Sequence, residues 1–134
     1  MSAPRPLPRL DANNRPFWTG GAEGELRLYR CRDCQAFTHP PRPVCRSCLS
    51  ENIAAEAVAG TGVVETFTVN YQAWHPKAEV PYVIARIVLD GVPGVYLTSN
   101  VINCDPETVD VGDRVKVVFE KHDDIYLPLF ERLS

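Results

Sequence analysis

Two closely spaced pairs of cysteines constrain the fold of this chain more than any other feature. The stretch YRCRDCQAFTHPPRPVCRSC, residues 29–48, holds four of the five cysteines as two C-x-x-C motifs with ten residues between them. Each motif can form a tight turn that directs two sulfur atoms at one point, and two facing turns complete a tetrahedral zinc site. The spacing therefore predicts one structural zinc ion bound by Cys31, Cys34, Cys45 and Cys48.

The same four thiols are compatible with other chemistry. A rubredoxin-type iron site uses the same ligands, and overexpression can load iron in place of zinc. Two disulfides are the alternative in an oxidising compartment, and a thioredoxin-like redox motif would need a βαβ unit, which neither pair has around it. His39 is a further candidate ligand if one cysteine is not used. A closed site of four cysteines leaves no open position for water or substrate, so we interpret it as structural.

The composition is typical of a soluble globular protein. Hydrophobic residues make up 45% and charged residues 23% of the 134 residues, both ordinary values. No apolar run approaches the roughly 18 residues of a membrane span, and the first residues lack the apolar region of a signal peptide. We therefore predict a cytoplasmic location, where cysteine pairs bind metal more often than they form disulfides.

Charge is distributed unevenly along the chain. Up to Cys48 there are eight arginines and four acidic residues, a net charge of +4, whereas the remainder has six basic and thirteen acidic residues, a net charge of −7. Arg30, Arg32, Arg42 and Arg46 lie close to the cysteines and can offset the charge of −2 on a zinc ion with four thiolates. Arginine is also suited to phosphate and carboxylate recognition. Solvated surface charge is the plainer interpretation of any single arginine.

The second half of the sequence alternates with the period of β-strands. GTGVVETFTVNY (60–71) places Val63, Glu65, Phe67 and Val69 on one face, with Val64, Thr66, Thr68 and Asn70 on the other. Similar patterns follow in YVIARIVLD (82–90), VPGVYLTSNVI (92–102), RVKVVFEKH (114–122) and YLPLFERL (126–133). About five strands without a long helix between them predict a small closed barrel, because closure removes exposed edges.

A short helical turn is expected near the N-terminus. Asn14 can cap it and Pro16 suits its first turn, but three glycines between residues 20 and 24 oppose a longer helix. Phe17 and Trp18 are adjacent aromatic residues in this thin segment. They either pack on the main domain or anchor a partner.

Motifs of the common enzyme classes are missing from the sequence. It has no G-x-S-x-G elbow, no phosphate-binding glycine loop and no H-E-x-x-H helix. Cys104 lacks a sequence context that would activate its thiol, so we interpret it as inert rather than as a nucleophile. His75 and His122 are interpreted as surface residues. No catalytic residue is predicted.

One loop gathers groups suited to recognition. NYQAWHPKAEVPY (70–82) contains Tyr71, Trp74, His75 and Lys77 between two predicted strands. Apolar and cationic side chains together fit a partner protein or an adenine-phosphate ligand. The plainer alternative is an ordinary barrel loop that packs on itself.

Taken together, these segments resemble the DUF35 family, in which a rubredoxin-like zinc ribbon precedes an OB-fold. The resemblance covers most of the chain. It rests on RPFW (15–18), GELRLYRCRDC (24–34), HPPRPVCRSC (39–48), GTGVVETFTV (60–69), PYVIARIVLDG (81–91), VGDRVKVVF (111–119) and LPLF (127–130). The pair Gly20-Gly21 departs from the family, whose members often have a better helix former there.

The resemblance implies a mainly β fold with three parts: an N-terminal arm with a short helix (1–28), a four-cysteine zinc ribbon (29–56) and a five-stranded OB-fold barrel (57–134). It also implies a non-catalytic subunit of a thiolase-superfamily enzyme, either a thiolase or a retro-aldolase such as those of steroid side-chain degradation. Such subunits line the channel for the CoA group of an acyl-CoA substrate or hold the partner in its active shape. Because the sequence begins with Met and has no fused domain, we expect a separate subunit.

The residues expected to contact the partner or CoA are Phe17, Trp18, Arg42, Tyr71, Trp74, His75 and Lys77. Two other functions stay open at this point. The chain could be a structural stabiliser that does not touch CoA, or a single-stranded nucleic-acid-binding OB protein. The acidic second half opposes the latter, because a nucleic-acid footprint is normally basic.

Overall fold

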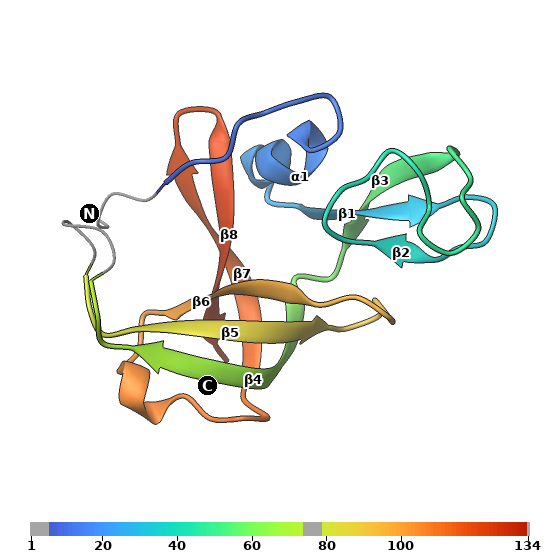
Figure 1. Cartoon of the computed structure of the whole chain (residues 1–134). Coiled ribbons are helices and arrows are strands. Elements are labelled where there is room, and N and C mark those ends of the chain that lie inside the picture. The colour runs from blue at the N-terminus through green and yellow to red at the C-terminus, as the bar shows by residue number, and fades with distance from the viewer. Residues whose placement is uncertain (1–5, 74–78, 134) are drawn as a thin grey trace.

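A three-stranded sheet and a closed five-stranded barrel make up the protein (Figure 1), as a computed structural model describing residues 6–73 and 79–133 shows. In chain order the elements are α1 (Arg15–Thr19), the 3-10 helix η1 (Gly20–Glu23), β1 (Leu26–Cys31), β2 (Phe37–Thr38), β3 (Ile53–Val58), β4 (Thr61–Asn70), β5 (Tyr82–Leu89), β6 (Leu97–Ile102), the 3-10 helix η2 (Pro106–Thr108), β7 (Arg114–His122) and β8 (Ile125–Arg132). The mainly β fold with a short helical arm, a four-cysteine ribbon and a five-stranded barrel is confirmed.

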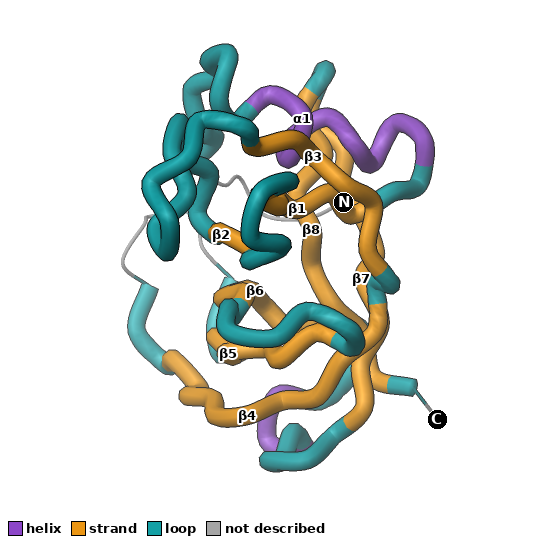
Figure 2. Tube along the Cα trace, turned by 90° about the vertical axis from the view of Figure 1, so that its right-hand side faces the viewer, coloured by secondary structure: helices purple, strands orange, loops and turns teal. Residues whose placement is uncertain are grey.

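The ribbon sheet has the antiparallel order β2-β1-β3, and the barrel has the order β4-β5-β6-β8-β7. Figures 1 and 2 place the ribbon sheet above the barrel, on the side of β6 rather than of β4. The strands themselves run from Leu26 to Val58 in the ribbon and from Thr61 to Arg132 in the barrel. The domain boundaries at 28/29 and 56/57 stay a prediction, because strand ends do not define domains.

Alternation predicts the inner faces of β5 and β7 correctly. Val83, Ala85, Ile87 and Leu89 of β5 are all buried, and Val115 of β7 is buried with Val117 and Phe119 packed against the core. Strand β4 departs from the predicted alternation. Its register with β5 shifts between Val64 and Thr66, so a bulge at Glu65 moves the inward face from Val64 to Phe67 and Val69. A bulge adds one unpaired residue and reverses which side chains face the core.

The barrel closes through a short backbone ladder between β6 and β8. These two strands are parallel and pair only at Val101 with Phe130 and at Ile102 with Glu131. Further along this seam the Ser99 hydroxyl donates a hydrogen bond to the Pro128 carbonyl at 2.6 Å. A side chain thus bridges the two strands where the backbone ladder stops.

The N-terminal arm packs on the barrel rather than projecting from it. Phe17 is 3% exposed and belongs to the main core, while Trp18 and Leu10 cover the apolar stripe of Ile125, Leu127 and Leu129 on β8. Gly21 makes the approach close, because a Cβ atom there would lie 2.4 Å from Cβ of Tyr126. Asn14 does not cap α1 with its side chain. Its Oδ1 atom instead accepts a hydrogen bond from the Asp11 amide at 2.8 Å.

Two contacts set the position of the ribbon on the barrel. Arg46, between the last two cysteines, donates a hydrogen bond to the Gly94 carbonyl in the loop before β6. At the connection from β3 to β4, the Val117 amide donates to the Gly60 carbonyl at 2.6 Å. The ribbon is therefore held at its cysteine end as well as by the chain itself.

Candidate functional site

The four cysteines predicted as metal ligands come together in the ribbon. Their sulfur atoms all lie within 4.8 Å of one another. The Sγ atoms of Cys31 and Cys48 are 3.6 Å apart, and those of Cys34 and Cys45 are 3.5 Å apart. Zinc–sulfur bonds of about 2.3 Å in a tetrahedron place neighbouring sulfurs about 3.8 Å apart. The donor set and its spacing therefore fit a zinc ion.

Backbone amides point at the sulfurs, as expected for a thiolate site. The Cys34 amide lies 3.5 Å from Sγ of Cys31, and the Ser47 amide lies 3.3 Å from Sγ of Cys45. Hydrogen bonds from the amides of Cys48 and Ser47 lower the pKa of the Cys45 thiol to about 6. The first cysteine of each motif is buried, whereas Cys34 and Cys48 are exposed.

A polar clamp supports the first turn of the site. The carboxylate of Asp33, between Cys31 and Cys34, accepts hydrogen bonds from the side chains of Ser50 and Asn52. These bonds lower the pKa of Asp33. The clamp ties the first C-x-x-C motif to the segment that leads into β3, so both sides of the ribbon are held around the sulfurs.

His39 is not part of the cysteine cluster. Among the described residues the four cysteines are the one group of His, Cys, Asp and Glu side chains whose geometry could hold a metal. The His39 ring lies 5.0 Å from the ring of Phe17, and its Nδ1 atom is buried without a hydrogen-bond partner. Burial lowers the pKa of His39 to about 4, which keeps the ring neutral at physiological pH.

The arginines near the cysteines divide into paired and unpaired groups. Arg30 forms an ion pair with Glu56 at 3.2 Å and lies over the ring of Phe37, and Arg46 contacts Gly94. The side chains of Arg32 and Arg42 are exposed and make no hydrogen bond or ion pair with the rest of the described chain. Of these four arginines, Arg32 and Arg42 are the ones free to meet an external phosphate or carboxylate.

A cavity of about 290 Å³ lies where arm, ribbon and barrel meet, over the seam between β6 and β8. We call it the junction cavity. It is lined by Phe17, Trp18, His39, Pro40, Pro41, Leu97, Thr98, Ser99, Asn100, Leu127, Pro128 and Leu129. Sequence reasoning did not find it, although the apolar HPP segment between the cysteine pairs was a signal that this loop packs on something.

The predicted contact residues fall on separate surfaces. Phe17 is buried within the chain and has little surface to offer a partner, whereas Trp18 is half-buried and lines the junction cavity. Arg42 follows Pro41 at the edge of that cavity. Tyr71 is 60% exposed, and its hydroxyl donates to Glu107 at 2.6 Å.

The end of β4, which directly precedes Tyr71 in the chain, lies away from the ribbon. Figure 1 shows the end of β4 and the start of β5, which flank its loop, on the opposite side of the barrel from the ribbon. The other three predicted residues of this loop, Trp74, His75 and Lys77, lie outside the described residues. The described part of the chain therefore does not bring Tyr71 and Arg42 into one site.

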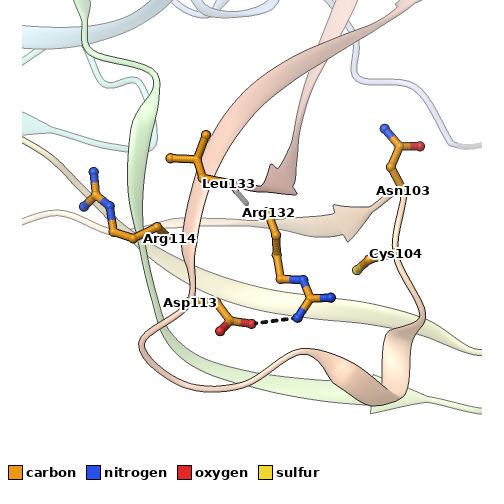
Figure 3. A pocket seen from close by; sticks show the side chains of 6 residues that line it. All are labelled: Asn103, Cys104, Asp113, Arg114, Arg132 and Leu133. Atoms are coloured by element: carbon orange, nitrogen blue, oxygen red, sulfur yellow. Dashed lines mark hydrogen bonds and ion pairs between the residues drawn. The ribbon is translucent and has the colours of Figure 1, made fainter.

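A second hollow of about 290 Å³ contains the fifth cysteine (Figure 3). It is lined by Asn103, Cys104, Asp113, Arg114, Arg132 and Leu133. Both arginines are engaged: Arg114 pairs with Asp90 at 2.6 Å, and Arg132 pairs with Asp113 at 3.4 Å. Cys104 is half-buried, and none of the described residues that line the hollow with it is a histidine. The carboxylate of the lining, Asp113, is paired with Arg132, so the described lining offers the thiol neither an imidazole nor an unpaired carboxylate as a base.

No helix in the described part of the chain is long and apolar enough to cross a membrane.

Comparison with known families finds matches over most of the chain. Residues 18–54 match the family described as ChsH2, rubredoxin-like zinc ribbon domain. Residues 55–120 match the family described as ChsH2, C-terminal OB-fold domain. The first match contains all four cysteines of the cluster.

Individual proteins are similar to this chain over much of its length. The chain is 31% identical over 127 residues to a probable enoyl-CoA hydratase alpha subunit of Thermomonospora curvata, covering 94% of this chain but 39% of that protein. It is 31% identical over 94 residues to a DUF35 domain-containing scaffold protein of Methanothermobacter thermautotrophicus, covering 69% of each. Among solved structures, the Ltp2-ChsH2(DUF35) aldolase matches with a TM-score of 0.82 and 28% identity, over 94% of this chain and 98% of that one.

Proposed function

Because this chain belongs to the DUF35 family, with a ChsH2-type zinc ribbon and OB-fold, we propose that it is a non-catalytic subunit of a thiolase-like acyl-CoA enzyme. The observation that carries the proposal is the match to the Ltp2-ChsH2(DUF35) aldolase over 98% of the matched chain. The partner is a thiolase or a retro-aldolase, including the aldolases of steroid side-chain degradation. The chain supports the activity of this partner and the binding of its CoA substrate in a hetero-oligomer.

The ribbon holds one zinc ion in a structural role. Cys31, Cys34, Cys45 and Cys48 bind it, and the closed set of four sulfurs leaves no position for a substrate. Iron can replace zinc on overexpression, because the ligand set is that of rubredoxin.

Contact with CoA is proposed for the ribbon side of the junction cavity. Arg42 is exposed, has no partner among the described residues and follows a proline that lines the cavity. A guanidinium group can bind a CoA phosphate with two parallel hydrogen bonds. Tyr71, Trp74, His75 and Lys77 form a second candidate surface for the partner or the ligand.

Assembly is tested with a purified thiolase-superfamily enzyme from the same organism. Mixed at low micromolar concentration, the two proteins should elute together from a sizing column, and the enzyme should be more active in the complex. Two elution peaks and unchanged activity would contradict the proposed function.

Two substitutions separate assembly from ligand contact. Trp18→Ala should weaken the complex, since truncating an aromatic anchor costs about 2 kcal/mol or more of binding free energy, and a melting curve controls for loss of fold. Arg42→Ala should leave the complex intact and raise the KM of the partner for its acyl-CoA substrate. An unchanged KM in an intact complex would favour a stabilising subunit that does not touch CoA through Arg42.

Binding of single-stranded nucleic acid is the competing function of an OB-fold. The net charge of −7 from Leu49 onward opposes it, because a nucleic-acid footprint is normally basic. A gel-shift titration with single-stranded DNA at low salt should show no complex.

A further inference from the structure

The outer edge of β3 carries backbone groups that point away from its own sheet. The Arg32 amide donates to the Asn52 carbonyl at 2.9 Å, and this pair continues the register of β1 with β3, in which Arg30 faces Ala54. Hydrogen-bonded pairs alternate along an antiparallel ladder. Ala54, Glu56 and Val58 therefore direct their N–H and C=O groups at β1, whereas Ile53, Ala55 and Ala57 direct theirs outward.

Most of the outward groups have no partner within the chain. β3 is at the margin of the ribbon sheet, with β1 on its inner side (Figure 1). The Ile53 amide is used locally, because it donates to the Glu51 carbonyl at 2.9 Å. The Ile53 carbonyl and both backbone groups of Ala55 and Ala57 make no hydrogen bond to any part of the chain that the structure describes.

The two edges of this sheet differ in protection. The β2 edge is two residues long and is followed by Pro40, Pro41 and Pro43. The β3 edge has six residues, IAAEAV, without a proline, a lysine or a register shift. Natural proteins usually block an exposed edge with such features. An unblocked edge of this length is a template for strand addition.

Side chains do not hinder approach to the β3 edge. Ala54, Ala55 and Ala57 offer only methyl groups. The one charged residue of the strand, Glu56, is ion-paired at 3.2 Å with Arg30 on the neighbouring strand β1. A second backbone can therefore reach hydrogen-bond distance without displacing a long side chain or burying an unpaired charge.

We infer that the outer edge of β3 binds an extended segment of the partner subunit as a fourth strand of the ribbon sheet. Main-chain hydrogen bonds give such an interaction its affinity. This inference rests on the proposed function and names the mode by which the partner is held. It uses a surface distinct from the junction cavity, since no residue of β3 lines that cavity.

Charge favours a partner segment over a second copy of the chain. The strand connects directly to the barrel, and the residues from Leu49 onward carry a net charge of −7. Two copies of the chain each carry a net charge of −3, so like-charge repulsion opposes the pairing of two β3 edges. The fitting occupant is an extended segment with neutral or basic side chains.

A proline at Ala57 tests the inference, because it removes an outward N–H group and none that faces β1. Ala57 is exposed, so Ala57→Pro should leave the zinc content and the melting temperature close to those of Ala57→Ser, the matched control. Binding is measured by titration calorimetry with the purified thiolase-superfamily enzyme that forms the complex. We expect the Kd to rise at least tenfold for Ala57→Pro and less than twofold for Ala57→Ser.

Hydrogen exchange on the unmodified complex gives a second measurement that needs no substitution. The amides of Ala55 and Ala57 should exchange rapidly in the isolated chain and become protected in the complex. A complex in which both amides stay unprotected and Ala57→Pro binds normally overturns the edge inference and leaves the proposed function standing. Absence of any complex with the unsubstituted chain overturns both. A dimer of the isolated chain that Ala57→Pro dissociates, seen by sedimentation, assigns the edge to a second copy and also overturns the inference.

Discussion

At the scale of single residues, each cysteine sulfur has a position that its neighbours in the sequence help to define. The x-x residues of each motif provide amides that point at sulfur, as Ser47 does toward Cys45 at 3.3 Å. The free energy of metal binding in such a site becomes folding free energy, about 10–16 kcal/mol in zinc-finger peptides near neutral pH. Loss of one cysteine ligand should therefore destabilise the folded ribbon, and any loss of function should follow from that unfolding.

We predict that Cys31→Ser unfolds the ribbon and removes its zinc, because Cys31 is buried in the cluster. Elemental analysis should give about one zinc per unsubstituted chain and much less for the variant. Amide NMR spectra should show that the barrel signals persist. Cys104→Ser is the control and should retain full zinc content, and a fully folded ribbon in metal-free Cys31→Ser would contradict the prediction.

His39 makes the stability of the contact between ribbon and arm depend on pH. Burial lowers its pKa from 6.5 to about 4, so the folded state favours the neutral ring. When the pKa of a histidine is lower in the folded state than in the unfolded state, the unfolded state binds a proton more readily. The free energy of unfolding is therefore at its full value above pH 6.5 and falls as the pH drops from 6.5 to about 4. The loss amounts to roughly 3 kcal/mol, at about 1.36 kcal/mol for each pKa unit.

We predict that His39→Phe reduces the acid sensitivity of the fold in this window. Urea unfolding at pH 8, 6, 5 and 4 in zinc-containing buffer should show a smaller fall in unfolding free energy for the variant. Asp90 affects the free energy of unfolding in a lower pH range, because the hydrogen bond from Arg114 lowers the pKa of Asp90 to about 2. Its contribution is present above about pH 4 and is lost only as the pH falls toward 2. Parallel curves for the variant and the unsubstituted protein between pH 6 and 4 would show that His39 is not the group responsible.

At the scale of elements, the N-terminal helices depend on glycines for contact rather than for flexibility alone. η1 rests on β7 and β8, and Gly21 faces Phe119 and Tyr126. The Tyr29 hydroxyl on β1 donates to the Asn13 carbonyl and ties the arm to the ribbon as well. The lack of a Cβ atom at Gly21 therefore allows the arm to lie close to β7 and β8.

We predict that Gly21→Ala destabilises the protein by about 1–3 kcal/mol, the usual cost of overpacking. The added Cβ would lie 2.4 Å from Cβ of Tyr126 and 2.7 Å from Cδ1 of Phe119, so the arm must shift. Gly24→Ala is the control, because a Cβ there meets open space and its φ of +70° alone should cost about 1 kcal/mol. Thermal unfolding should show a larger loss of stability for Gly21→Ala than for Gly24→Ala. Equal losses of stability would contradict the role of the contact between Gly21 and the side chains of Phe119 and Tyr126.

At the scale of the whole molecule, ribbon, arm and barrel meet around the junction cavity. Arg46 links the cysteine end of the ribbon to Gly94, and Trp18 and His39 meet over the barrel seam. The second hollow contains a thiol, but both of its arginines are paired with carboxylates. These contacts are consistent with the accessory role that we propose for the chain.

We predict that the isolated chain has no turnover with acyl-CoA thioesters. Thiol release followed with a chromogenic disulfide, and aldehyde or ketone release followed by mass spectrometry, should match a protein-free control. Adding the thiolase-like enzyme should produce activity, and Cys104→Ala should leave that activity unchanged. Turnover by the isolated chain that survives repurification and disappears in Cys104→Ala would reverse the interpretation of this thiol.

Local patterns were sufficient for the metal cluster, the barrel strands and the family. The spacing within and between the C-x-x-C motifs determines where four sulfurs can meet, and alternation with period two depends only on adjacent residues. For this reason the inner residues of β5 and β7 and the four cysteines followed from the sequence alone.

Contacts between residues far apart in the chain decided the rest. The bulge at Glu65 depends on how β4 pairs with β5 and β7, and the burial of Phe17 and His39 depends on the arm closing over the seam. The position of β3 at an open edge depends on which strands pair with β1. The alternation of neighbouring residues does not predict the bulge, the burial of these side chains or the open edge. Each of them requires segments well separated in the sequence to fold against one another.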